Sequence, residues 1–367
     1  LPAALLIHGA RGIGKQHLAL WVGRLLLCTA PQDDGPCEKC RSCLLAGKLE
    51  HPDLHWYFPL PRPKKVGTAE KLEQALEEAR AEALADRRRQ PLRPIGESEA
   101  RSLYLAAARN LRKRAQRRPS MGPRQIFIIA EAEALAPHAS SSEAANALLK
   151  LLEEPPEGTT LILTSAEPGR LLPTIRSRTT QLHVPPLSHR EVLDFLKTEA
   201  GVDEEEAIRA AGHSKGAIGR ALGFLKDGER PGLMAQTRSD ALALLGAALS
   251  AKPGPRIRAS LEFKSVGARG LGDLFDFLEE CLCDLARAAS GLPVEGCTDE
   301  EAAFFGKAAS RRGIHPAALP KAVARVHQAR LMAAGNVNPQ LIIFGLLHDL
   351  QAELDASESS PHPGDAG

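Results

Sequence analysis

The sequence predicts an α/β domain, a parallel sheet with helices on both faces, followed by two helical domains. Three observations predict this fold class. Short apolar runs alternate with helix-patterned segments up to residue 165, which is typical of parallel sheets. Beyond residue 185 the pattern is helical and is broken by Gly and Pro. Finally, 367 residues are enough for two or three domains, and aromatic residues make up only 4% of a chain rich in Ala, Leu and Arg.

Three apolar runs are the predicted strands, namely residues 3–8, 125–130 and 160–165. Apolar residues at helical spacing predict the helices, with Thr68 as an N-cap. These cover residues 15–27, 68–85, 142–154, 188–198 and 204–211. We expect a sheet domain at 1–183 with a charged insertion at 59–118, a helical lid at 184–227, a C-terminal helical domain at 238–350 and a disordered polar tail at 357–367.

Composition limits the classes of function. A net charge of +2 does not by itself indicate nucleic-acid binding, but residues 87–118 hold eleven Arg or Lys against Glu97 and Glu99. Such a run is either a solvated face or a surface for DNA or a partner, and the sequence leaves both open. The longest apolar runs, such as 341–347, are too short to cross a bilayer. Residues 1–8 lead into a glycine-rich loop and are expected to form a buried strand rather than a signal peptide.

Residues 9–15 have the spacing of a phosphate-binding loop. Their sequence is Gly-Ala-Arg-Gly-Ile-Gly-Lys, and they lie between a predicted strand and a predicted helix. The glycines Gly9, Gly12 and Gly14 let backbone N–H groups turn toward an anion, and the helix N-terminus adds positive charge. Lys15 is expected at the terminal phosphates. The alternative is a glycine-rich turn that binds nothing.

The loop lacks residues that hold magnesium. A Ser or Thr should follow the lysine, but the residue there is Gln16. An Asp should end the strand at 125–130, but that position is Ala130, and only Glu131, which would orient the attacking water, is present. Because Mg²⁺ neutralises the charge that develops in phosphoryl transfer, we expect weak or no ATP binding and very slow or no hydrolysis.

Four cysteines within residues 28–43 have the spacing of a metal site. Cys28 is followed by Cys37, Cys40 and Cys43. Thiolates are preferred ligands of structural zinc, and four of them leave no position for a reacting water, so the spacing predicts a structural zinc ion. The alternative is a set of buried free cysteines or a redox pair. Crowded cysteines of this kind fit a reducing cytosol better than a disulfide framework, so we expect a cytoplasmic protein.

Further segments make the sequence recognisable. Residues 146–156 are Asn-Ala-Leu-Leu-Lys-Leu-Leu-Glu-Glu-Pro-Pro, residues 163–165 are Leu-Thr-Ser, and residues 175–178 are Ile-Arg-Ser-Arg. With the phosphate loop and the cysteine module, they resemble the AAA+ clamp-loader subunits of bacterial DNA polymerase III, gamma/tau and delta-prime. The resemblance covers residues 1–225 and 336–350 and is weak across the 59–118 insertion.

The resemblance implies roles for further residues. Arg178 matches the arginine finger that the family offers to a neighbouring subunit, although the Cys that follows it in the family is Thr179 here. Thr164 matches the first sensor, which contacts the gamma-phosphate. Gly219 falls at the position of the second sensor's arginine, and Arg220 comes one residue late. The alternative for Arg178 is a surface arginine held in a salt bridge.

Loss of the magnesium ligands together with a kept finger is typical of the delta-prime type. The resemblance implies a stator in a ring with gamma/tau and delta subunits, which loads the sliding clamp onto primed DNA. No independent ATPase is expected, although the holoenzyme is a DNA-directed DNA polymerase. Two alternatives stay open. One is an active gamma/tau-type ATPase in which Gln16 and water complete the metal shell, and the other is a regulatory AAA+ protein that binds DNA through residues 87–118.

Overall fold

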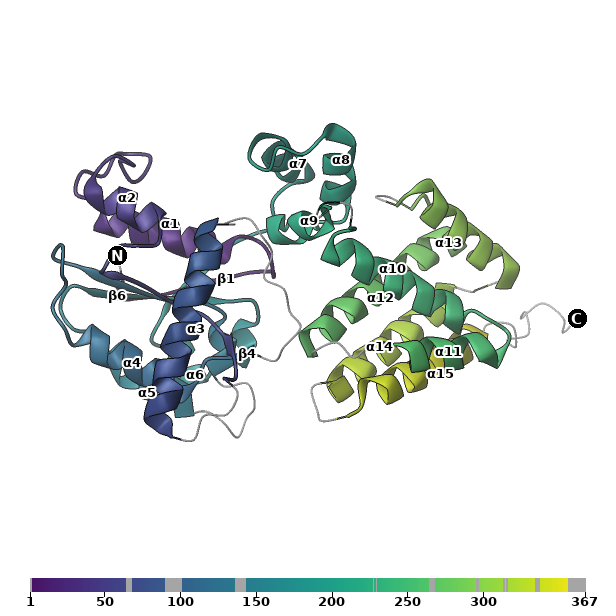
Figure 1. Ribbon diagram of the computed structural model, residues 1–367. Helices are drawn as coiled ribbons and strands as arrows, with labels where there is room; N and C mark the ends of the chain where they lie inside the picture. Colours follow the sequence, from purple (N-terminus) through teal and green to yellow (C-terminus); the bar gives the residue numbers. More distant parts are fainter. Residues whose placement is uncertain are drawn as a thin grey trace, which may run out of the picture. The chain divides into compact units, whose positions relative to one another are not determined.

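The computed structural model describes residues 2–63, 68–89, 101–135, 143–226, 228, 230–263, 268–294, 297–312, 314, 316–333 and 337–355 (Figure 1). The described residues form two compact units. The first contains those up to 201 together with 214–222, and the second contains 202–213 and those from 223 on. This grouping does not test the division at 183 and 227, which stays a prediction. The predicted tail at 357–367 and parts of the 59–118 insertion lie outside the described residues.

The first unit is built on a five-stranded parallel sheet, which confirms the predicted fold class. In spatial order its strands are β2 (Leu54–Tyr57), β5 (Gln125–Ile129), β6 (Thr159–Ser165), β1 (Ala4–His8) and β7 (Thr180–His183). The three predicted strands agree with β1, β5 and β6 to within one residue at each end. Sequence reasoning missed β7, because all its residues are exposed and it has no apolar run. It also missed the short strand β2.

Both faces of the central strands are buried, and alternate residues face opposite sides. One face carries Leu6, Phe127 and Leu163 in a single core, and the other carries Ile7, Ile128 and Ile162 in a second core. The first core is completed by α4 (Leu105–Ala115) and α5 (Glu143–Glu153), and the second by α1 (Lys15–Leu27) and α3 (Ala69–Arg89). The sheet is therefore covered by helices on both faces, as predicted.

Loops that follow β1, β5 and β6 meet at one edge of the sheet, because parallel strands share the direction of their carboxyl ends. The chain leaves β1 toward β2 on one side, and after β6 it returns to place β7 on the other side of β1. In open α/β sheets, ligand sites lie at the carboxyl edge where the strand order reverses. The topology therefore places the loop at residues 9–14 where such a site is expected.

The hydroxyl oxygen of Thr68 accepts a hydrogen bond from the Lys71 backbone N–H at 3.3 Å, which confirms the predicted N-cap of α3.

The remaining elements of this unit are short. They are α2 (Arg41–Gly47), β3 (Leu60–Pro61), β4 (Arg101–Ser102), η1 (Ala132–Leu135), η2 (Pro168–Arg170), α6 (Pro173–Arg176) and α7 (His189–Thr198). Helix α9 (Ile218–Phe224) belongs to this unit up to Leu222.

The second unit is helical, as the sequence predicts. Phe275, Phe277 and Phe305 are fully buried in its core, where α10, α12, α14 and α15 pack against one another along their apolar faces. Its helices are α8 (Glu204–Gly212), α10 (Leu233–Ala248), α11 (Pro253–Glu262), α12 (Ala268–Ala289), α13 (Asp299–Arg312), η3 (Pro316–Ala318), α14 (Leu319–Ala333) and α15 (Pro339–Asp355). No helix among the described residues is long and apolar enough to cross a membrane.

Candidate functional site

The phosphate-loop residues lie between β1 and α1, at the carboxyl edge of the sheet. Gly9, Gly12 and Gly14 have φ angles of 154°, 75° and 96°, values that side chains disfavour. A Cβ atom on Gly9 would lie 2.4 Å from the carbonyl oxygen of Val184, so only glycine fits there. The backbone therefore turns as a phosphate loop does, and α1 begins directly behind it.

Lys15 turns its ammonium group into its own loop. The residue is 7% exposed, and Nζ donates to the carbonyl oxygens of Gly9 at 2.9 Å and Ala10 at 2.7 Å. Burial lowers the pKa of Lys15, while the negative charges of Glu133 and Glu131 oppose this shift. The ammonium group therefore stabilises the carbonyl groups of its own loop, and its expected place at the terminal phosphates stays a prediction.

Gln16, Glu131 and Thr164, three of the candidate site residues, come together next to the loop. Nε2 of Gln16 donates to Oε1 of Glu131 at 3.4 Å, and the backbone N–H of Glu131 donates to Oγ1 of buried Thr164 at 3.2 Å. Ala130 is fully buried. At a nucleotide site, oxygens of the residue after the lysine and of the residue that ends the neighbouring strand hold Mg²⁺, and water and phosphates complete its shell. Here the first position directs an amide nitrogen at the carboxylate of Glu131 and the second is a buried methyl group, so this donor set does not fit Mg²⁺.

A later segment of the chain closes onto the loop through its backbone. The N–H of Gly219 donates to the carbonyl oxygen of Gly12 at 2.7 Å. A Cβ atom on Gly219 would lie 3.1 Å from both Cα and the oxygen of Gly12, and one on Gly12 would lie 3.0 Å from the Arg220 nitrogen. The residues at the second-sensor position therefore contact the loop as main chain. We name this contact the Gly12–Gly219 contact.

Sequence reasoning missed Arg87, at the end of α3, as a residue of this region. Its guanidinium carbon lies 3.6 Å from the ring centre of Phe58 and 4.3 Å from that of Trp56. Burial lowers the pKa of Arg87 to about 10, and the negative charge of Glu131 opposes this shift. Arg87 is therefore a largely buried cation near the carboxyl edge, unlike the solvated or DNA-facing run that was expected. The sequence did hold one indication of this site, because Trp56 and Phe58 lie two residues apart in a chain with few aromatic residues, and aromatic rings attract arginine side chains.

Arg178 lies two residues after α6 and is held by groups of its own chain. Its Nε and Nη2 lie 2.8 and 2.5 Å from Oε1 of Glu153, and Nη1 donates to the carbonyl oxygen of Thr174 at 3.0 Å. A weaker contact joins Nη1 to Oγ of Ser177 at 3.4 Å. The side chain is still 34% exposed. The salt-bridge alternative is therefore present in the structure, and the finger role stays a prediction.

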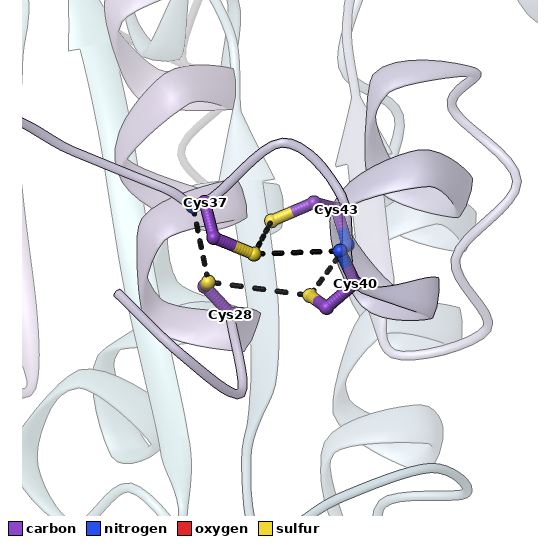
Figure 2. Close-up of side chains that lie close together, drawn as sticks. All are labelled: Cys28, Cys37, Cys40 and Cys43. Carbon is purple, nitrogen blue, oxygen red and sulfur yellow. Dashed lines mark hydrogen bonds between the residues drawn. The ribbon is translucent and has the colours of Figure 1, made fainter. Parts of the chain in front are cut away.

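The four predicted cysteines point toward a common centre (Figure 2). Cys28 follows α1, and Cys37, Cys40 and Cys43 come from the loop and the start of α2. Their sulfur atoms all lie within 4.8 Å of one another, and two of the pairs are separated by 4.0 Å. A tetrahedron of sulfur atoms about 2.3 Å from zinc has edges of about 3.8 Å. The arrangement therefore needs little contraction to hold one metal ion.

The acidities of the clustered thiols also favour a bound cation. Burial opposes ionisation of Cys40, but hydrogen bonds from the backbone of Thr29 and Cys43 lower the pKa of its thiol to about 5. Burial and hydrogen bonds with Cys40 and Cys28 raise the pKa of the Cys43 thiol to about 12. Four adjacent thiolates therefore form only when a positive ion balances their charge. The donor set fits a structural metal such as zinc.

The parallel sheet, the loop of phosphate-loop shape at its carboxyl edge and the helical region that follows have the architecture expected of an AAA+ protein. A family model described as "DNA polymerase III, delta subunit" matches residues 1–188 of the 367. The chain belongs to this family of clamp-loader subunits, of the delta-prime type.

Individual relatives agree with the family assignment. The delta-prime subunit of Pseudomonas aeruginosa is 32% identical over 205 residues, 56% of this chain and 50% of the relative. That of Escherichia coli is 28% identical over 223 residues, 61% of this chain and 54% of the relative. The gamma/tau subunit of Mycobacterium bovis is 30% identical over 251 residues, 66% of this chain and 36% of the relative. The chain thus spans about half the length of the delta-prime relatives that it matches.

Proposed function

We propose that this chain is a DNA polymerase III clamp-loader subunit that has no ATPase activity of its own and supplies Arg178 to the nucleotide site of a neighbouring subunit. The observation that carries the proposal is the contrast within the first unit. The donor set at Gln16 and Glu131 does not fit Mg²⁺, whereas Arg178 is part-exposed in the turn that follows α6. An arginine that reaches a neighbour's phosphates stabilises charge without needing its own metal site.

The partners follow from the family. The proposed ring contains gamma/tau and delta subunits and acts on the sliding clamp and primed DNA. In this ring the chain is the stator, with an AAA+ domain at 1–183, a lid at 184–227 and a collar domain at 238–350. We expect it in the reducing cytoplasm, where the thiols of the four-cysteine cluster stay free to hold zinc as a structural ion.

The test is the ATPase activity of the ring reconstituted with gamma/tau and delta subunits. Arg178→Ala should lower the clamp- and DNA-stimulated rate only partly, because the other nucleotide sites keep fingers from other subunits. Arg178→Lys should rescue poorly, since an ammonium group lacks the planar fork that spans two phosphate oxygens. Arg170→Ala is the matched control, because Arg170 is also exposed and paired with a nearby carboxylate, that of Glu167. An unchanged rate in Arg178→Ala would leave Arg178 with a structural role only.

The DNA-binding alternative has one supporting observation. Arg109 and Lys113 are exposed one turn apart on α4, and Arg117 and Arg118 follow, also exposed. Several phosphate contacts would give the isolated chain an affinity for DNA that falls steeply with salt. A titration of duplex DNA at two or more salt concentrations decides, and a flat, weak response rejects this alternative.

A further inference from the structure

Glu153 and Arg178 form the main side-chain contact between two segments that the sequence singles out separately. A single carboxylate oxygen, Oε1 of Glu153, contacts both Nε and Nη2 of the arginine. On its other side, Nη1 donates to the carbonyl oxygen of Thr174. Nη1 also makes a weaker contact with Oγ of Ser177 at 3.4 Å. Nη2 carries two N–H groups and directs one of them at Glu153, so the other, on the outer edge of the guanidinium, is available for another acceptor.

The backbone that carries Glu153 is firmly placed. Glu153 is the last residue of α5, and Pro155 explains this end because a proline disfavours helical conformation in the residue before it. Leu152 and Ile175 are buried in the same core, on α5 and α6 respectively. The carboxylate therefore lies at the end of α5 and the arginine in the turn after α6, and these two helices pack on each other.

We propose that Glu153 is the positioning residue for Arg178, holding the guanidinium so that its outer edge faces a neighbour's phosphates. An exposed ion pair adds little to folding stability. It does restrict a long side chain that would otherwise sample many rotamers, and a misplaced group costs much of its effect on a reaction. The inference rests on the proposed finger function. It gives the Leu-Leu-Glu-Glu-Pro-Pro segment at residues 151–156 a role, because Glu153 is its first glutamate.

The experiment uses the reconstituted ring with Glu153→Ala, Glu153→Gln, Arg178→Ala and the double variant Glu153→Ala/Arg178→Ala. The neighbouring Glu154 is exposed and makes no recorded side-chain contact among the described residues, so Glu154→Ala is the matched control. Glu153→Ala should lower kcat at the site that Arg178 serves by roughly tenfold, with little change in KM for ATP. Glu153→Gln, which keeps an acceptor oxygen, should lose less. The double variant should be no worse than Arg178→Ala.

Each other outcome is decisive. If Arg178→Ala lowers the rate and Glu153→Ala does not, the finger function stands and the positioning role is wrong. If Glu153→Ala raises the rate, the carboxylate holds the arginine away from its target, and the proposal is again wrong. An unchanged rate in Arg178→Ala rejects the finger function and the positioning role together. Thermal melts of each variant should agree with wild type to within a few degrees, and a large drop for both Glu153 variants would make the pair structural.

Discussion

Without its proposed zinc ion, the cysteine module should unfold and the sheet should stay intact. The perturbation is the double substitution Cys40→Ser/Cys43→Ser, with chelation of the wild-type protein in parallel. The module spans residues 28–48 and contains only one short helix, α2, whose buried residues are Ser42, Cys43 and Ala46. A helix of this length is not stable alone in water.

The size of the expected loss of stability follows from how little apolar surface the module buries. Burial of the Cys43 and Ala46 side chains contributes only about 2 kcal/mol to folding of the module. Binding of a structural zinc ion by thiolates contributes about 10–16 kcal/mol, which already includes the cost of ordering the segment. Loss of the metal therefore removes most of what stabilises the module. The core that packs on α1 and α3 includes none of the four cysteines, so the sheet should keep its stability.

The assay combines elemental analysis with hydrogen exchange resolved along the chain. Wild-type protein should carry about one zinc per chain, and the double variant should lose it. Amide protection should disappear over residues 29–48 and persist in β1, β5 and β6. Cys283→Ser, at an exposed cysteine in the second unit, is the control and should change neither measurement. Protein purified without chelator that contains no zinc, or a module that stays protected in the double variant, would refute the reasoning.

Three further predictions concern the phosphate loop and the helical unit. The isolated chain should hydrolyse ATP at background rates, and Lys15→Ala should leave turnover unchanged; a Mg²⁺-dependent activity that needs Lys15 would instead support the gamma/tau alternative. Gly219→Ala should cost about 1 kcal/mol, a few degrees in melting temperature, because its Cβ would lie 3.1 Å from Gly12, whereas Gly169→Ala, with no atom within 4 Å, should change nothing. Arg238→Ala should lower the free energy of unfolding by about 3–5 kcal/mol in chemical denaturation, because it leaves the carboxylates of Glu301 and Asp284, which Arg238 contacts at 2.8 and 3.2 Å, without their partner. A loss below about 1 kcal/mol would contradict this.

Local patterns in the sequence predicted the features that lie within a few residues of one another. The apolar runs of β1, β5 and β6 and the cysteine spacing are of this kind, and the structure agrees with both. The expected defect of the phosphate loop also rests on local patterns, because Gln16 and Ala130 each occupy a position that a motif defines, and it stays a prediction. Strand β7 was missed because an exposed edge strand need not be apolar.

Contacts between distant segments were not predictable from the same patterns. The ion pair between Glu153 and Arg178 depends on how α5 and α6 pack. The position of Arg87 depends on where α3 passes Trp56 of β2 and Phe58, which follows this strand. A charge run carries no information on which of its members is buried, because side-chain burial is decided by the fold as a whole. The family resemblance was weak across this insertion, so it gave no help there.

The glycines of the phosphate loop are needed for the fold whether or not the loop takes part in nucleotide chemistry. Gly9 must be glycine because the carbonyl oxygen of Val184 occupies the place of a Cβ atom, and Gly12 must be nearly so because Gly219 and Arg220 pack against it. Lys15 likewise contributes to the fold without ATP, because its buried ammonium group donates hydrogen bonds to two carbonyl oxygens of the loop. None of these contacts involves the positions where magnesium ligands are missing. A loop with the shape of a phosphate site is therefore consistent with an inactive subunit, because packing alone requires the shape and only the reaction would require the metal.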